Sequence, residues 1–234
     1  MRSIVALFIT LLLSMSVRAE PEAALLAAHY RVALTGGEDS PPRESDWYLW
    51  REANRVETDH PADGLAEVWE RDERGELSLR RVFHADRRVL EYSGGELRAR
   101  GADSSWEALG SVVDPALLKK LERAGAKSLP EGEAVVYRGT ADGEQIEIWW
   151  LEKLRLPARM TRTRSGSSFT LALQSVRSDA PQDWPRVEEA AIAEYLLIDA
   201  ADLGDMHYDA FAQRVEHYDS AAGALGAVHG GHAH

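Results

Sequence analysis

The feature that most constrains the fold is a series of short segments in which apolar and polar residues alternate. Residues 46–58, 65–71, 76–84 and 87–92 follow this pattern, which is typical of β-strands. The segments are separated by short turn-forming runs such as Asp72-Glu73-Arg74-Gly75. Strands joined by short turns pair antiparallel, so this part of the chain predicts an antiparallel meander.

The same alternation returns later in the chain, in residues 134–139, 144–153, 156–164 and 167–177. The run Arg164-Ser165-Gly166-Ser167-Ser168 is typical of a polar hairpin turn, and residues 97–100 predict one further short strand. A sheet of about eight or more strands curls, which gives it a concave face. The sequence therefore predicts a strongly curved antiparallel sheet, or half-barrel.

Helical signals interrupt and flank these strands. Residues 22–35 carry a helical apolar stripe, and residues 106–109 and 114–123 predict helix in the middle of the sheet. Asp114-Pro115 supplies an N-cap and a proline at the first helical position. Residues 187–198 and 205–218, the latter capped by Asp205, predict two more helices. We expect an α+β fold with helices across the concave face and a C-terminal helical extension.

The N-terminus is typical of a secretory signal peptide. A basic start, an apolar run over residues 4–13 and the small residues Val17 and Ala19 favour cleavage after residue 19, and an uncut anchor is the alternative. The chain has no cysteine, so neither a disulfide nor a lipid on a cysteine is expected. We expect a non-lipidated periplasmic protein with a signal peptide (1–19), a half-barrel domain (20–178), an acidic helical extension (179–219) and a histidine-containing tail (220–234).

Charge narrows the possible partners. The formal net charge is −12, and removal of Arg2 and Arg18 takes the mature chain to −14. An acidic protein repels phosphate backbones, so we expect no nucleic-acid partner, and the mature chain carries no expected transmembrane segment. Residues 43–100 contain arginines but no lysine. We expect these arginines on exposed strand faces, although arginine also suits an anionic ligand.

Tryptophans on the predicted strands are the first candidates for a binding site. Trp149 and Trp150 are adjacent, so they must point to opposite faces of the sheet. One of the two faces can then line a groove for an apolar ligand, while ordinary packing of both faces is the alternative. The candidate ligand-binding residues are Trp50, Trp69, Trp149, Trp150 and Phe169.

The end of the chain is a candidate metal site. His229, His232 and His234 lie within six residues, and flexible histidine-rich ends bind Zn or Cu weakly. A solvated tail without metal is the alternative, and no other cofactor is expected. The aspartates of residues 199–209 do not match a calcium loop and are explained more simply as helix caps and first-turn acids.

The strand layout resembles that of the periplasmic lipoprotein carriers LolA and LolB and of the sensing proteins RseB and MucB. The resemblance covers roughly residues 22–178, and the extension that ends in histidines lies outside it. It implies a half-barrel whose concave apolar surface takes acyl chains or hydrophobic segments without catalysis. The segments that carry it are Trp47-Tyr48-Leu49-Trp50, Arg55-Val56-Glu57, Ile148-Trp149-Trp150, Leu156-Pro157-Ala158-Arg159-Met160, Ser165-Gly166 and Phe169-Thr170-Leu171-Ala172-Leu173.

Enzyme motifs are absent from the sequence: it has no nucleophile elbow, zinc-protease motif, phosphate loop or dinucleotide fingerprint. We therefore expect a non-enzymatic exported binding protein, a carrier or sensor of an apolar or amphipathic ligand such as a lipid or lipoprotein. One alternative is a periplasmic metal-binding or metal-trafficking protein that uses the tail. Another is an interaction module of an envelope complex that docks through the acidic C-terminal helices.

Overall fold

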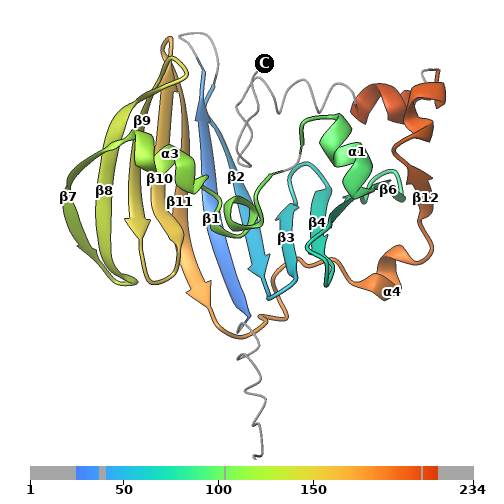
Figure 1. Ribbon diagram of the computed structural model, residues 1–234, viewed down its shortest axis with the longest axis horizontal. Helices are drawn as coiled ribbons and strands as arrows, with labels where there is room; N and C mark the ends of the chain where they lie inside the picture. Colours follow the sequence, from blue (N-terminus) through green and yellow to red (C-terminus); the bar gives the residue numbers. More distant parts are fainter. Residues whose placement is uncertain (1–24, 37–40, 103, 207, 216–234) are drawn as a thin grey trace, which may run out of the picture.

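Twelve strands form one curved sheet in the computed structural model, which describes residues 25–36, 41–102, 104–206 and 208–215 (Figure 1). Their order across the sheet is β12-β6-β5-β4-β3-β2-β1-β11-β10-β9-β8-β7. Every pairing is antiparallel except that of β12 with β6, which is parallel. The strands are β1 (Leu26–Thr35), β2 (Arg43–Arg51), β3 (Arg55–His60), β4 (Leu65–Arg71), β5 (Leu77–Phe83), β6 (Arg88–Tyr92), β7 (Glu122–Leu129), β8 (Gly132–Ala141), β9 (Glu144–Leu151), β10 (Leu156–Arg164), β11 (Ser167–Arg177) and β12 (Leu196–Asp199).

Three short helices from the connection between β6 and β7 lie across the concave face of the sheet (Figure 1). They are α1 (Gly94–Ala99), which contacts β5 and β6, α2 (Trp106–Ser111), and α3 (Pro115–Lys120), which contacts β8. The predicted cap at Asp114 is confirmed, because its carboxylate accepts a hydrogen bond from the Ala116 N–H at 2.7 Å. The α+β half-barrel predicted from the sequence is confirmed.

Two hairpins have the tight turns that their sequences favour. Asp142 and Gly143, between β8 and β9, both have positive φ angles, and so do Ser165 and Gly166 between β10 and β11. Positive φ at both central residues is the geometry whose twist matches that of paired strands. The polar hairpin turn predicted around Ser165-Gly166 is confirmed, and these turns set the register of the strands that carry Trp149, Trp150 and Phe169.

The helix predicted for residues 22–35 is wrong, because residues 26–35 form β1, which lies between β2 and β11 in the middle of the sheet. Both faces of β1 are covered in its first half, because Ala28 and Tyr30 face the concave core while Ala27 is buried on the convex side. A strand covered on both faces shows a nearly continuous apolar run rather than clean alternation. That run fits a helical stripe equally well in sequence.

Three further elements differ from the prediction. The expected strand at residues 97–100 belongs to helix α1, whose start is a capping box between Ser93 and Glu96. The expected strand 46–58 is two strands, β2 and β3, which form a hairpin. The helix expected over residues 114–123 ends at Lys120, and Glu122 already belongs to β7, an edge strand with a β-bulge before Gly125. The sequence gives β7 no strand pattern because it is exposed on both faces.

The C-terminal extension is less helical than predicted. Helix α4 spans only Glu189–Ile192, and the chain then forms β12, the 3-10 helix η1 (Asp202–Met206) and a helical turn at residues 210–215. β12 forms because the edge of β6 offers unpaired backbone groups. The N–H of its first residue, Leu196, donates to Arg87 O, and the N–H of Ala200, just after the strand, donates to Glu91 O. Asp205 lies within η1, and Asp209 instead caps the following turn by accepting from the Phe211 N–H at 2.7 Å.

The acidic extension is bound to the sheet by the arginines of residues 43–100. Glu189 pairs with Arg55 at 3.0 Å and with Arg80 at 2.7 Å, while Asp209 pairs with Arg88 at 3.0 Å. These arginine side chains are only about a fifth exposed, so the expectation that they decorate exposed strand faces is wrong for all three. The opposite charges of the two regions therefore join one part of the fold to another.

Candidate functional site

The concave face of the sheet carries one continuous apolar cluster, which we call the concave cluster. It runs from β6 at one side, through Trp69 on β4 and Trp47 on β2, to Ile148 and Trp150 on β9. Phe169 packs against it, and Trp69 and Trp150 are 4% and 8% exposed. The structure thus brings together three of the five predicted ligand-binding residues, namely Trp69, Trp150 and Phe169.

The remaining two predicted residues lie on the convex face. Trp50 is buried there, and its Nε1 donates to Pro185 O at 2.9 Å. Trp149 is half-buried, with Lys127 Nζ 4.1 Å above its ring and Glu147 accepting from its Nε1 at 2.7 Å. The expectation that Trp149 and Trp150 point to opposite faces is confirmed, and only Trp150 contributes to the concave cluster.

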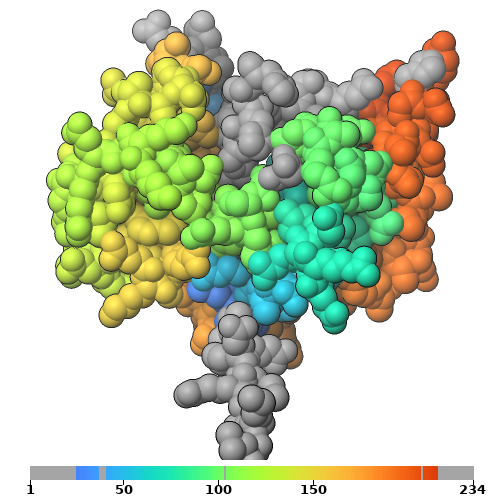
Figure 2. Space-filling model, in the orientation of Figure 1, coloured from blue at the N-terminus to red at the C-terminus, as the bar shows by residue number. Residues whose placement is uncertain are grey.

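The cover over the concave cluster is thin. Helices α1, α2 and α3 have six residues each, and α3 has no buried residue. In Figure 2 this covering segment, in green, lies between the strands at the two sides of the sheet. Leu109 and the two residues that follow α2, Val112 and Val113, extend into the cluster. Short helices of this kind owe their stability to the packing beneath them rather than to their own hydrogen bonds.

Arg51 holds this cover in place. Its guanidinium donates to Gly110 O in α2 at 2.7 Å and to Leu154 O, in the turn between β9 and β10, at 2.8 Å. Gly110 has no side chain at the point of contact, and a Cβ there would lie 2.9 Å from Arg51 Cδ. One side chain on β2 therefore tethers the covering helix and a hairpin from the other half of the sheet.

The concave cluster contains a small polar patch. Thr58 Oγ1 and Trp69 Nε1 are buried, and neither has a hydrogen-bond partner among the described residues. Beside them, Glu67 on β4 forms an ion pair with Arg81 on β5 at 2.8 Å. Buried polar atoms are almost always satisfied in folded proteins, so an unsatisfied pair on adjacent strands requires an explanation.

The convex face is crossed by the segment between β11 and α4, residues 178–188, which we call the strap. Its Val187 N–H donates to the carboxylate of Glu57 on β3, whose side chain is fully buried and also accepts from Arg55 at 2.9 Å. Burial raises the pKa of Glu57 despite these partners. Trp184 of the strap lies 5.5 Å from the Tyr48 ring and 6.1 Å from that of Trp50.

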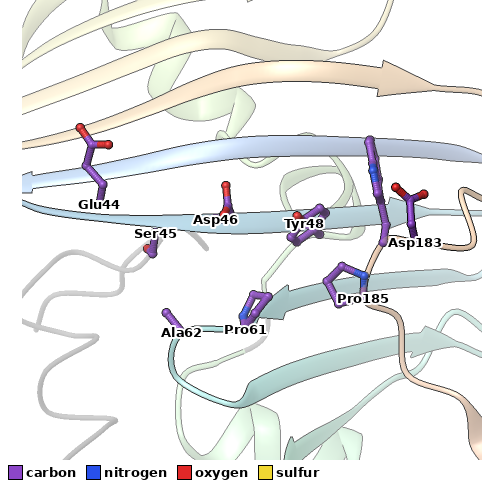
Figure 3. Close-up of a pocket in the computed structure, with 9 residues that line it drawn as sticks. Glu44, Ser45, Asp46, Tyr48, Pro61, Ala62, Asp183 and Pro185 are labelled. Atoms are coloured by element: carbon purple, nitrogen blue, oxygen red, sulfur yellow. The ribbon is translucent and has the colours of Figure 1, made fainter.

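Where the strap crosses β2, it leaves a pocket of about 590 Å³ on the convex face (Figure 3). We call it the convex pocket. Residues of β2, the turn between β3 and β4, and the strap provide its walls. Its lining residues are Glu44, Ser45, Asp46, Tyr48, Pro61, Ala62, Asp183, Trp184 and Pro185.

This pocket is not predicted by the sequence. The alternation along β2 does place Glu44, Asp46 and Tyr48 on one face, and that signal was available in the sequence. Nothing in the sequence shows that a segment more than a hundred residues later returns to cover that face. The polar atoms of Thr58 and Trp69 were missed because only packing shows that they lack partners.

The predicted metal ligands His229, His232 and His234 lie outside the described residues, so the metal-binding tail stays a prediction. Across residues 25–215, leaving out the positions the structure does not describe, no cluster of three or more potential ligand side chains could hold a metal ion. Among the helices that the structure describes, none is long and apolar enough to cross a membrane.

Comparison with known proteins shows that this chain is similar in fold to several solved structures. No protein family and no curated protein matches the sequence. Among solved structures, an uncharacterized conserved protein from Thermus thermophilus is 12% identical over 76% of this chain and 91% of its own, with a TM-score of 0.46. MucB in the Pseudomonas aeruginosa MucA/MucB complex is 18% identical over 74% of this chain and 58% of its own, with a TM-score of 0.37. The LolA superfamily protein NE2245 from Nitrosomonas europaea is 9% identical over 70% of this chain and 90% of its own, with a TM-score of 0.30. The families that the strand layout resembles are thus among the structural neighbours, and the likeness is one of fold alone.

Proposed function

We propose that this protein is an exported, non-enzymatic binding protein, a periplasmic carrier or sensor that takes an apolar or amphipathic ligand on the concave face of its sheet. The observation that carries the proposal is the concave cluster itself, an extended apolar surface covered by three six-residue helices. Displacing this cover exposes Trp69 and Trp150 on one curved surface. A curved apolar surface matches the shape and chemistry of an acyl chain.

The polar patch favours an amphipathic ligand over a purely apolar one. Thr58 Oγ1 and Trp69 Nε1 supply a hydroxyl and an N–H donor without partners, and the Glu67–Arg81 ion pair adds charge beside them. A ligand with a polar group at one end can satisfy these atoms while its apolar part contacts the rest of the cluster. The resulting complex would leave fewer buried polar atoms unsatisfied than the unliganded protein has.

The hydrogen bonds that join Arg51 to α2 allow a direct test of the proposed binding on the concave face. Because Arg51 holds α2 down, Arg51→Ala is expected to raise the population of molecules with an open concave face. Losing hydrogen bonds worth about 1 to 1.4 kcal/mol raises the apparent affinity for a ligand of that face about five- to tenfold. Fluorescence titration of the mature protein with N-phenylnaphthylamine, followed by displacement with lauric acid, measures this change.

The matched control is Arg138→Ala, which removes an arginine that is 59% exposed and paired with Glu147 on the opposite face. Its dye affinity should equal that of the wild type. Circular dichroism of both variants verifies that they remain folded. Absence of saturable dye binding in both wild type and Arg51→Ala would contradict the proposal, and so would dye that lauric acid does not displace.

A further inference from the structure

The convex pocket combines aromatic rings with carboxylates, and no described residue fills it. Tyr48 and Trp184 contact each other in its wall, with ring centroids 5.5 Å apart, and His29 stacks on Tyr48 at 4.6 Å. Glu44, Asp46 and Asp183 contribute three carboxylates to the lining (Figure 3). Among the described residues, Arg31 lies 3.3 Å from Asp46 and 3.8 Å from Glu44, and His29 Nε2 lies 2.8 Å from Asp46. The charge of Arg177, which pairs with Asp179, also acts on Asp183. Arg31 offsets one of the three carboxylate charges, so the lining keeps an excess of negative charge.

A fourth acid lies on the same face of the sheet beside the pocket. Asp59 on β3 pairs with Tyr48 on β2, and its side chain points to the convex face, as that of Glu57 does. Asp59 is only 5% exposed, and no residue that the structure describes gives its carboxylate a hydrogen bond or an ion pair. Burying most of a carboxylate without a partner destabilises its ionised form, so a cation in the adjacent pocket would stabilise Asp59.

The negative charges of these acids act on Tyr48 in the wall of the pocket. The pKa of the Tyr48 hydroxyl is raised, first by burial and then by the negative charges of Asp46, Asp183 and Asp59. The pocket is also much larger than a metal ion, at about 590 Å³. Aromatic faces attract organic cations through their quadrupole, and surrounding carboxylates strengthen that attraction.

We propose that the convex pocket binds an organic ammonium group, held against the parts of the Tyr48 and Trp184 side chains that line the pocket and attracted by the carboxylates of Asp46 and Asp183, with Asp59 beside them. This site lies on the opposite side of the sheet from the concave cluster, so it does not depend on the function proposed for that cluster. The ammonium group can belong to a free amine or to a lipid headgroup, and the chemistry of recognition is the same for both.

Calorimetric titration of the mature protein with tetramethylammonium and with spermidine tests the free amines, and sedimentation with phosphatidylcholine vesicles tests the headgroup. We expect saturable binding that weakens at least tenfold in Trp184→Ala and severalfold in Asp183→Asn. Asp183 is exposed and has no hydrogen bond or ion pair among the described residues, so its replacement leaves the fold intact. Binding should also weaken as salt rises.

The matched control is Trp149→Ala, which removes a half-buried convex tryptophan flanked by Lys127 and Arg159 instead of by carboxylates. Its binding should equal that of the wild type. Binding to vesicles alone, lost in both pocket variants, supports the site with a headgroup as its source. No saturable binding of any of the three probes, or equal losses in Trp149→Ala and Trp184→Ala, overturns the proposal.

Discussion

Replacing Glu57 by alanine is expected to lower the free energy of unfolding by about 3 to 5 kcal/mol, the range for breaking a buried ion pair. The Glu57 side chain is fully buried, and its carboxylate accepts from the Val187 N–H and from Arg55. Without it, the Val187 N–H and part of the Arg55 guanidinium lose their partner in a place that water does not reach. Urea unfolding followed by tryptophan fluorescence measures the change.

The matched control is Glu70→Ala on the neighbouring strand. Glu70 also contacts Arg55, at 3.3 Å, but its side chain is 45% exposed. Exposed ion pairs contribute little, so this variant should lose less than about 1 kcal/mol. Equal losses in the two variants would show that burial of Glu57 is not what anchors the strap.

Hydrogen exchange adds a local measurement to the same experiment. The amides of the strap and of α4 should exchange faster in Glu57→Ala, because Glu57 is their link to β3. Those of β9 and β10, on the other half of the sheet, should change much less. This pattern separates the loss of one anchor from a general loss of stability.

The parts of the fold that could be predicted are those that depend on local sequence. The residues around Phe169 alternate cleanly between apolar and polar, and β4, β10 and β11 begin and end as their patterns indicate. Asp114-Pro115 started a helix because capping needs only the next few residues. The opposite directions of Trp149 and Trp150 follow from the geometry of any strand.

The parts that could not be predicted depend on contacts between distant segments. β1 has a helical stripe in sequence, and only its place between two strands makes it β. Trp50 was placed among ligand-binding residues because the strap that covers it, through Pro185, lies 135 residues later. β12 forms because β6 offers an open edge, which overrides the helical pattern of its own residues.

Replacing Asp59 by asparagine is expected to stabilise the protein at neutral pH. Burial, and then the charge of Glu57, raises the pKa of Asp59 from 3.8 to about 6. The folded state therefore holds a proton that the unfolded state releases between about pH 4 and pH 6, so the wild type loses stability as the pH rises through this interval. At about 1.4 kcal/mol per pKa unit, the loss is about 2 to 3 kcal/mol at pH 7.

Asparagine carries no charge at any of these pH values, so Asp59→Asn should be more stable than the wild type by about 2 to 3 kcal/mol at pH 7 and nearly equal to it at pH 4. Urea unfolding of both proteins across this range measures the difference. Asp63→Asn is the control, because Asp63 lies exposed in the turn that follows β3 and its replacement makes the same chemical change outside the interior. A difference that is the same at pH 4 and pH 7 would contradict an ionised, buried Asp59.

The same experiment connects stability to the convex pocket. A buried carboxylate that destabilises the folded protein at neutral pH is the kind of group that binding sites keep at a cost in stability. A bound ammonium ion would stabilise the ionised form of Asp59, so tetramethylammonium should raise the stability of the wild type at pH 7 more than that of Asp59→Asn. An equal rise in both proteins would place the cation away from Asp59 and restrict its contacts to Asp46 and Asp183.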